Sequence, residues 1–311
     1  MKASNKNLFC FQKAVSFFLI SLFILSIVSS CKSVEGPATN TLPDLFAYAK
    51  RLYEYGAYSD ANLELQKLTY TSRATEYEDD VQFYLGLSYY QNRQFLLSSD
   101  AYQTLLRNVP GSPYGKQAFF GIASCYYSLS PTYALDQEYT RRAISQYQAF
   151  LETYPPPDSA KIAEEIDNLK TLLVATDDST RKTRYNDLIS RLQAQYGQLD
   201  TLRLAEERIQ ICRAKLARKT LETAKQYVNL RAFRSATLYF DEVMTSFSDS
   251  ELYEEALLGK IDMLRIRKRW QDAMAEIEKY EDRFPAKKNV VESVKRTVES
   301  ELSGTQSALQ Y

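Results

Sequence analysis

A short pattern of aromatic, small and apolar residues recurs along this chain. In the segment RQFLLSSDAYQTLLRNVP, Phe95 is followed by Ser98 three positions later and by Tyr102 seven positions later, and the segment ends in Val109-Pro110. Residues three and seven positions apart lie on one face of an α-helix. A small residue lets a neighbouring helix approach closely, and proline stops the helix. The pattern therefore predicts an amphipathic helix between the aromatic residue and the proline.

Four other segments follow the same pattern. The residues at the aromatic position of the five copies are Tyr58, Phe95, Thr140, Phe233 and Trp270. A helix containing a small residue precedes several copies, with Gly86, Gly121 or Ala224 at the matching place, whereas the last copy has Ile261 there, which predicts a wider helix crossing. A string of such helix pairs resembles the tetratricopeptide repeat. The predicted fold is all-α, a tetratricopeptide-like helical-hairpin solenoid of about five repeats. An unrelated all-α bundle is the alternative.

The gap between the third and fourth copies predicts an insertion. Three helical runs are expected there, over Ser159–Ala175, over Arg181–Tyr196, and from Leu202 into the fourth repeat. Residues 156–200 are interpreted as an inserted helical hairpin, with a degenerate repeat as the alternative. Repeats one to three then occupy residues 43–155, and repeats four and five occupy 201–285. Within the last segment, 286–311, a charged helix over Lys287–Leu302 would cap the solenoid before a frayed tail.

The first thirty residues are typical of an export signal. Lys2, Lys6 and Lys13 precede a nearly uninterrupted apolar run over Ala14–Val28. A helix of this length spans about 22 Å, which is short of the roughly 30 Å hydrocarbon core of a bilayer. The pattern favours a signal peptide over residues 1–30 that is removed by cleavage. A permanent membrane anchor is the alternative.

The end of this run resembles a lipobox, the processing site of bacterial lipoproteins. The residues that carry the resemblance are Val28-Ser29-Ser30-Cys31. It implies cleavage before Cys31 and acylation of the thiol and the new amino group of that residue. Residues 31–42 would then form a flexible, lipidated tether. In the alternative, an ordinary secretory cleavage leaves Cys31 as a free thiol.

Composition narrows the classes of function. Lys and Arg number 39, as do Asp and Glu, so the chain lacks the basic excess that is typical of nucleic-acid binders, and no nucleic-acid partner is expected. Histidine is absent, which excludes Ser-His-Asp and Cys-His catalysis. No residue pattern indicates a catalytic site, so the chain is predicted not to be an enzyme. A helical glycan lyase or lytic transglycosylase with one catalytic glutamate is the remaining enzymatic alternative.

The cysteines do not have the spacing of a metal site or a disulfide framework. Cys10, Cys31, Cys125 and Cys212 form no CxxC pair. Cys125 and Cys212 lie in apolar helical stretches and are expected to be small core residues. We therefore predict neither a metal nor a cofactor.

Two segments resemble the BamD (ComL or YfiO) family of outer-membrane β-barrel assembly lipoproteins. Leu135–Pro155 resembles the third repeat of that family, and Ala205–Phe247 resembles the fourth, with Leu216-Ala217 ahead of Ala224 and Tyr227. The resemblance implies a lipid-anchored scaffold at the periplasmic face of the outer membrane. It also implies docking onto the barrel-inserting component, BamA, through the C-terminal repeats, and capture of unfolded outer-membrane proteins by the N-terminal repeats. A periplasmic repeat lipoprotein that coordinates peptidoglycan with the envelope, of the Tol-associated type, is the alternative.

Two surfaces are candidate partner contacts. Since the first helices of such repeats line a groove, six residues are candidates for binding client peptides: Phe46, Lys50, Tyr53, Phe83, Leu87 and Tyr90. These side chains are alternatively explained by packing between helices. The densest basic cluster lies within Arg265–Trp270, where the candidates for docking a partner or lipid head groups are Arg265, Arg267, Lys268 and Arg269. A solvated helix face is the alternative there.

Overall fold

The computed structural model describes residues 34–308, and this part of the chain is built from helices without a strand. The predicted signal peptide and Cys31 lie outside the described residues, so cleavage and acylation remain predictions. The chain divides into two compact units, Met1–Ser88 and Tyr89–Tyr311. Within residues 34–308, no helix has both the length and the apolar character needed to cross a bilayer.

The first unit holds the start of the repeat pattern. It contains α2 (Leu42–Tyr55), α3 (Tyr58–Thr71) and the part of α4 (Glu78–Gln91) that ends at Ser88. Proline in the first turn of α2 suits its start, because the N–H that proline lacks would have no partner there. Ala49 and Ala61 are fully buried, which lets α2 and α3 pack closely.

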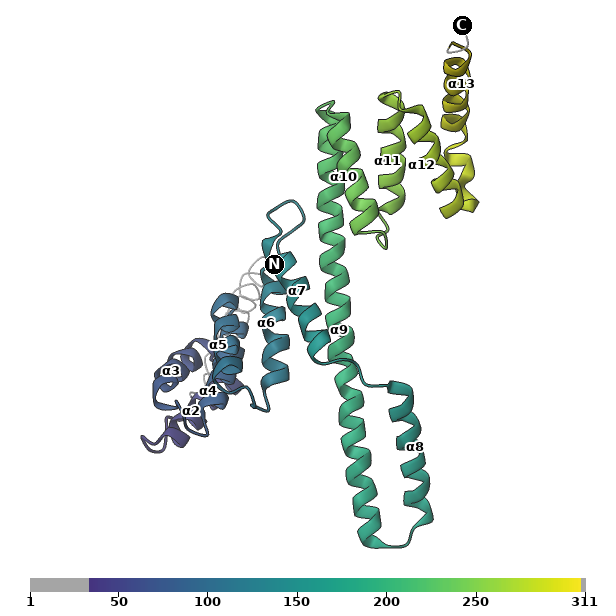
Figure 1. Cartoon of the computed structure of the whole chain (residues 1–311). Helices are drawn as coiled ribbons and strands as arrows, with labels where there is room; N and C mark the ends of the chain where they lie inside the picture. Colours follow the sequence, from purple (N-terminus) through teal and green to yellow (C-terminus); the bar gives the residue numbers. More distant parts are fainter. Residues whose placement is uncertain (1–33, 309–311) are drawn as a thin grey trace, which may run out of the picture. The chain divides into compact units, whose positions relative to one another are not determined.

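The second unit holds the remaining helices (Figure 1). They are α5 (Phe95–Asn108), α6 (Gly115–Leu129), α7 (Glu138–Thr153), α8 (Ser159–Ala175), α9 (Ser179–Asn229), α10 (Phe233–Ser246), α11 (Tyr253–Ile266), α12 (Trp270–Arg283), the 3-10 helix η1 (Pro285–Val290) and α13 (Glu292–Ala308). Consecutive helices pack side by side from α5 to α7 and from α9 to α12.

The structure confirms the predicted helix pairs. Four of the five aromatic-position residues are the first residues of α3, α5, α10 and α12, and Thr140 is the third residue of α7. The small residues three positions after each of them are fully buried: Ala61, Ser98, Ala143, Ala236 and Ala273. The large residues seven positions after are at most 4% exposed: Leu65, Tyr102, Tyr147, Phe240 and Ile277. Offsets of three and seven thus mark the buried face of the second helix in each of the five pairs among the described residues.

Four connections in the described part of the chain share one turn geometry. Gly56, Arg93, Arg231 and Lys268 each have a positive φ. At the last of these, the N–H of Lys268 donates to the carbonyl of Arg265 (3.0 Å), and the N–H of Arg269 donates to that of Leu264 (2.9 Å). The same offsets recur at the other three turns. These bonds satisfy carbonyl groups at the end of the first helix, which offsets the roughly 1–2 kcal/mol cost of a left-handed conformation outside glycine.

Two glycines make matching close contacts in the second unit. A Cβ atom on Gly259 would lie 2.5 Å from Cζ of Phe240, and one on Gly121 would lie 2.5 Å from Cε2 of Tyr102. Gly259 therefore occupies in α11 the place that Gly121 occupies in α6. Ile261, two residues later, is a core residue that is 2% exposed, and the wider helix crossing expected there stays a prediction.

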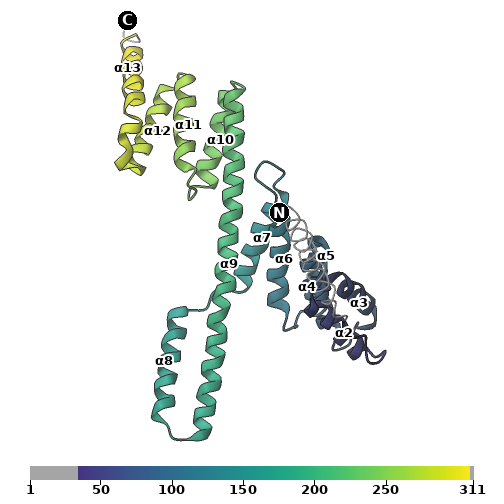
Figure 2. The same cartoon turned by 180° about the vertical axis from the view of Figure 1, so that it is seen from behind.

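The insertion is a helical hairpin, but its second helix is longer than predicted. α8 has the predicted bounds Ser159–Ala175, whereas the runs Arg181–Tyr196 and Leu202 onward form one helix, α9, of 51 residues. α8 lies alongside the first part of α9 in both views (Figures 1 and 2). Gly197 does not interrupt α9, because a glycine costs a helix only about 1 kcal/mol. The buried residues Ile189 and Leu202 hold the helix on either side of it.

The end of the chain differs in detail from the predicted capping helix. Residues Pro285–Val290 form a 3-10 helix, and the α-helix begins at Glu292 rather than at Lys287. Non-helical backbone angles at Lys287 separate this turn from a regular helix. α13 continues to Ala308, beyond the predicted end at Leu302, and buries Val298 against the core formed with α12.

Candidate functional site

Aromatic rings gather around Tyr84 in the first unit. The Tyr84 ring centroid lies 5.6 Å from that of Phe46 and 5.7 Å from that of Tyr53, both edge to face. The Nζ of Lys50 lies 5.1 Å from the same centroid, and a hydrogen bond with Tyr84 raises the pKa of Lys50. The structure thus brings the three α2 candidates together around a residue that the sequence prediction missed. Phe46, Lys50 and Tyr53 are four and three residues apart, which places them on one face of α2 and indicated that they contact a common residue.

The three α4 candidates have different surroundings. Phe83 is buried, and its ring packs edge to face against Tyr84 at 5.9 Å. Leu87 is half-buried. Tyr90 belongs to the second unit, where its hydroxyl lies 3.0 Å from Oγ of Ser128 and its ring lies 5.3 Å from that of Phe95. Of the candidates in the first unit, Lys50, Tyr53 and Leu87 are partly exposed, whereas Phe46 and Phe83 are buried.

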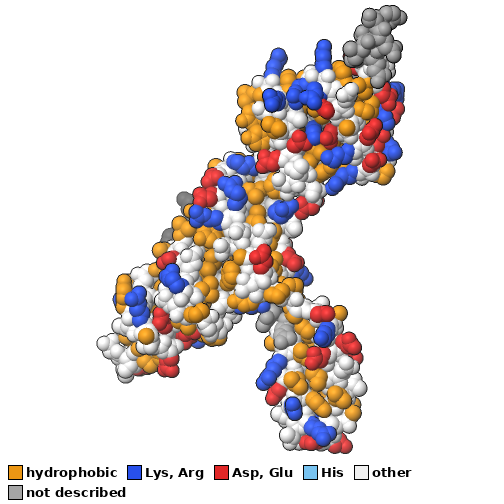
Figure 3. Space-filling view, in the orientation of Figure 1, with side chains coloured by type: hydrophobic (Ala, Val, Ile, Leu, Met, Phe, Trp, Pro, Cys, Tyr) orange, Lys and Arg blue, Asp and Glu red, His pale blue; other side chains and the backbone are white. Residues whose placement is uncertain are grey.

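The predicted basic cluster forms the turn between α11 and α12. Nη2 of Arg265 lies 3.3 Å from Asp262, and Nη2 of Arg269 lies 2.5 Å from Asp272. Arg267 is half-buried and Lys268 is exposed. Figure 3 shows basic side chains gathered at the end of the body that holds the α9–α10 and α11–α12 turns. Two of the four predicted docking cations are thus already paired with acids three residues away.

Arg208 of α9 sits among aromatic rings of α6 and α7. Its Nη1 donates to Oγ of Ser124 (2.8 Å) and to the hydroxyl of Tyr147 (2.6 Å). The guanidinium carbon lies 4.9 Å from the ring centroid of Tyr127 and 5.5 Å from that of Phe120. Stacking on rings and hydrogen bonding at the rim suit the planar guanidinium group. These contacts fasten α9 to the third helix pair.

The hydroxyl of Tyr147 stays protonated at this junction. Burial raises the pKa of Tyr147 to about 12, while hydrogen bonds with Ser124 and Arg208 act in the opposite direction. Because the pKa of Tyr147 is higher in the folded chain than in the unfolded one, its contribution to folding stability is complete below the unfolded-state pKa, near 10. That contribution is lost as the pH rises through the folded-state pKa. The junction is therefore intact throughout the neutral pH range.

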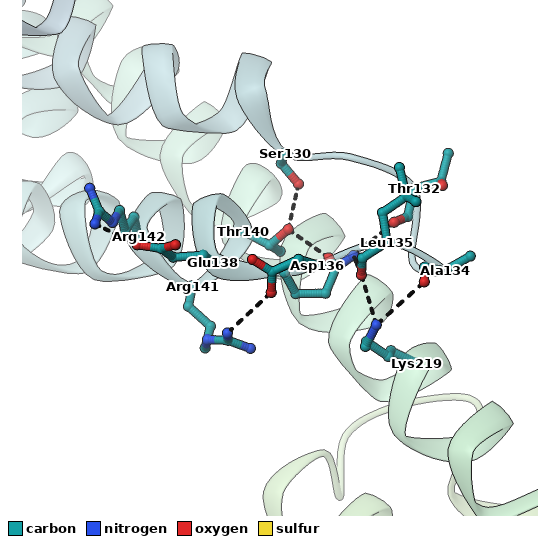
Figure 4. A network of polar contacts seen from close by, with 11 residues as sticks. Ser130, Thr132, Ala134, Leu135, Asp136, Glu138, Thr140, Arg141, Arg142 and Lys219 are labelled. Atoms are coloured by element: carbon teal, nitrogen blue, oxygen red, sulfur yellow. Dashed lines mark hydrogen bonds and ion pairs between the residues drawn. The ribbon is translucent and has the colours of Figure 1, made fainter. Parts of the chain in front are cut away.

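The loop between α6 and α7 replaces the turn found in the other pairs. Gln137 is fully buried, and its Nε2 donates to the carbonyls of Thr132 (2.7 Å) and Leu135 (2.9 Å). Oγ1 of Thr140 donates to Oε1 of Gln137 (2.7 Å) and lies 2.7 Å from Oγ of Ser130 (Figure 4). These bonds explain why the third repeat has threonine at the aromatic position. The polar side chain there closes the loop.

Two lysines of α9 hold this loop from outside. Nζ of Lys219 donates to the carbonyl of Leu135 at 2.7 Å (Figure 4), and Nζ of Lys215 donates to Oγ of Ser130 at 2.9 Å. Sequence reasoning did not find these contacts, because 84 or 85 residues separate the partners. Together with Arg208, these lysines connect α9 to α6, α7 and the loop between them.

Removal of the Lys219 contact is expected to loosen the loop without unfolding the protein. Lys219→Ala should cost about 0.5–1 kcal/mol, because one charge-assisted bond near the surface is lost. Amide exchange should become faster at residues 132–136, as measured by mass spectrometry. Lys182→Ala, at an exposed position of the same helix, is the control. Equal exchange rates in the two variants would show that Lys219 does not hold the loop.

The two cysteines of the described region are free and buried, as expected of core residues. Burial raises the pKa of Cys125 to about 11, although a hydrogen bond with Ser98 opposes this. A thiol with so high a pKa is a poor nucleophile and a poor metal ligand. Within residues 34–308, no group of three His, Cys, Asp or Glu side chains is arranged to hold a metal ion.

No protein-family model matches this sequence, and no curated protein sequence matches it. Among solved structures, the chain is similar to a tetratricopeptide repeat protein from Parabacteroides merdae, with 14% identity and a TM-score of 0.31 over 83% of this chain and 98% of that one. It is similar to the P58(IPK) TPR domain, with 14% identity and a TM-score of 0.30 over 85% of this chain and 66% of that domain's chain. It is also similar to the assembly chaperone of RpL4, Acl4, with 11% identity and a TM-score of 0.27 over 87% of this chain and 100% of that one. Because these scores are low, the assignment of tetratricopeptide-like helix pairs stands on the contacts within this chain.

Proposed function

We propose that this chain is a non-enzymatic scaffold that binds protein partners. The observation that carries the proposal is the helix pair itself, which recurs five times within residues 34–308 with the same buried positions. Within the second unit, consecutive helices pack side by side from α5 to α7 and from α9 to α12, which leaves their remaining faces accessible. Such faces bind peptides and domains through side chains rather than through a catalytic centre.

The specific role that we propose is in outer-membrane β-barrel protein assembly. The segments Leu135–Pro155 and Ala205–Phe247, which resemble the BamD family, correspond to α7 with its preceding loop and to the C-terminal part of α9 with α10. In this proposal, the pairs from α9 to α12 dock onto the barrel-inserting component, BamA. The helices α2 to α4 contact unfolded outer-membrane proteins, and acylated Cys31 anchors the chain at the periplasmic face of the outer membrane.

One observation favours a second role, that of a Tol-associated coordinator of peptidoglycan and envelope. Ile162, Ile166, Leu169 and Leu173 of α8 are spaced four, three and four residues apart, as in a coiled coil. Lipoproteins of that type carry a coiled-coil segment ahead of their repeats. The hairpin here lies between the third and fourth helix pairs, which supports assembly as the first choice.

Affinity capture tests the two roles against each other. The full chain, purified from membranes of its source in mild detergent, is expected to bring down a large β-barrel protein with periplasmic repeats. Depletion of the chain should reduce the amount of assembled porins. Recovery of Tol-Pal components or murein alone, with unchanged porins, would refute the assembly role.

Replacing Cys31 by alanine is expected to abolish incorporation of radiolabelled palmitate. The reason is that the thiol is the acceptor for the lipid in the predicted lipobox. The variant should also leave the membrane fraction, because the lipid is the proposed anchor. Cys125→Ala, within the buried core, is the control and should keep the label. Labelling of the Cys31 variant would contradict lipidation at this position.

A further inference from the structure

A cavity of about 390 Å³ lies between α9 and the loop that joins α10 to α11. On the α9 side it is lined by Gln210, Arg213, Ala214 and Arg218. On the loop side it is lined by Phe247 and by residues 249–252. This volume lies at the small end of the range for ligand pockets, about 300–1,000 Å³. It is large enough for one or two side chains of a bound peptide.

The cavity exists because α9 continues past the end of α10. α10 has 14 residues and α9 has 51, so the α10–α11 loop faces helix rather than solvent. Nη2 of Arg213 donates to the carbonyl of Ser246 (3.1 Å) and to Oδ1 of Asp249 (2.7 Å), which fixes the loop on α9. From α12, Nη2 of Arg283 donates to the carbonyl of Ser248 (2.7 Å). Because Arg213 and Arg283 both hold the loop, the cavity is already formed in the chain without a bound partner.

Most of the lining is apolar, and its charges are balanced. Ala214 and Leu252 supply apolar surface, whereas Phe247 is 9% exposed and the guanidinium carbon of Arg213 lies 5.6 Å from the centroid of its ring. The two arginines are matched by Asp249 and Glu251. Asp249 is paired with Arg213, and Arg218 with Glu222 at 3.1 Å. A phosphate would be repelled by the two carboxylates as well as attracted by the two guanidinium groups, so the lining does not favour a strongly charged ligand. The side chain that suits this cavity is therefore uncharged and apolar.

The polar side chains of the lining can form hydrogen bonds with a peptide backbone. Gln210 and the arginines carry N–H donors, while Ser250 and Glu251 carry acceptors. Arg218 also lies over the ring of Tyr133, with its guanidinium carbon 5.7 Å from the centroid, and Tyr133 is 40% exposed. The α6–α7 loop thus adds an exposed aromatic side chain next to one wall.

We propose that this cavity binds an extended peptide segment of a protein partner and receives one apolar side chain from it. The inference rests on the proposed scaffold function and assigns that function a site outside the predicted groove and the predicted basic cluster. Main-chain groups of the peptide form hydrogen bonds with polar side chains of the lining, and a Leu-, Ile- or Phe-sized side chain contacts Ala214 and Leu252.

The test uses a defined probe and a variant that fills the cavity. Twelve-residue random peptides displayed on phage are selected on the mature chain, and enriched sequences are synthesised. They are expected to share one large apolar residue between uncharged neighbours. Ala214→Trp should weaken their binding about tenfold or more, because the apolar side chain loses its contact area. Gln210→Trp, from the same exposed face, should reproduce the loss. Ala194→Trp, on α9 away from the cavity, is the matched control and should bind as the unchanged chain does.

Several results would overturn this assignment. Enrichment of charged peptides, absence of enrichment, or equal binding by the Ala214 and Ala194 variants would each show that the cavity is not a peptide site. Concentration-dependent association of the chain that Ala214→Trp removes would show instead that a second copy occupies it. Membrane capture separates this inference from the scaffold role. If the Ala214 variant binds the selected peptides as well as the unchanged chain does while the unchanged chain still brings down the barrel protein, only the cavity assignment fails, whereas loss of capture by the unchanged chain contradicts the scaffold role.

Discussion

Replacing Gly259 by alanine is expected to destabilise the C-terminal helix pairs by about 1–3 kcal/mol, the usual range for overpacking a core. The added methyl group would lie 2.5, 2.6 and 2.9 Å from three atoms of the Phe240 ring. Phe240 is 4% exposed and cannot swing into solvent. Either the ring leaves its position or α10 and α11 move apart. Denaturant unfolding followed by circular dichroism, together with amide exchange in α10–α12, measures the loss.

Two further variants make this prediction specific. Gly197→Ala places the same substitution in α9, where nothing lies within 4 Å of the added Cβ, and should stabilise the helix by up to about 1 kcal/mol. Phe240→Leu in the Gly259→Ala background should cost less than the sum of the two single variants, because the smaller side chain makes room for the methyl group. Equal effects of alanine at positions 259 and 197, or strict additivity, would show that the contact is not tight.

Replacing Arg208 by alanine is expected to cost about 2–4 kcal/mol and to free α9 from α6 and α7. The variant loses two charge-assisted hydrogen bonds and the stacking of a guanidinium group on aromatic rings. Exchange should accelerate in α7 and around residues 202–212, while α11 and α12 keep their protection. Since Tyr147 has a pKa of about 12, the loss should be the same at pH 6 and pH 9.

Arg203 provides the matched control on the same helix. Its side chain is 80% exposed and pairs only with Asp200 in the contacts of the described region, at 3.2 Å. Arg203→Ala should therefore change stability by less than about 0.5 kcal/mol. Arg208→Lys keeps the charge but not the planar guanidinium group, so its loss of stability should lie between those of Arg203→Ala and Arg208→Ala. If the lysine variant were as stable as the unchanged chain, charge alone would account for the role of Arg208.

The helix pairs were readable from the sequence because their signal is local. Offsets of three and seven residues define one helix face, and the residues at those offsets are buried in every pair. The bounds of α8 were also predictable, since Asp158 caps its first turn by accepting from the N–H groups of Ala160 and Lys161. Single glycines carried less information. Gly197 lies between two runs that were predicted as separate helices, yet α9 continues through it, and the close contact at Gly259 was not predicted.

The candidate contact residues were only partly resolved by sequence. Spacing placed Phe46, Lys50 and Tyr53 on one face of α2, but it gave no sign that Tyr84 stands at the centre of their contacts. In the basic turn, composition identified a cluster of cations. Only the structure showed that Arg265 and Arg269 are held by neighbouring acids.

By itself, the sequence determined the number and kind of helix pairs, because periodicity and helix ends depend on neighbours within a few turns. The tertiary structure alone decided that α9 is continuous, that Arg208 and Lys219 fasten it to the third pair, and that a cavity opens beside the α10–α11 loop. The last two features depend on atoms that come together from positions 33 to 84 residues apart. No local pattern encodes such distances, since they follow from how far one long helix extends past its shorter partner.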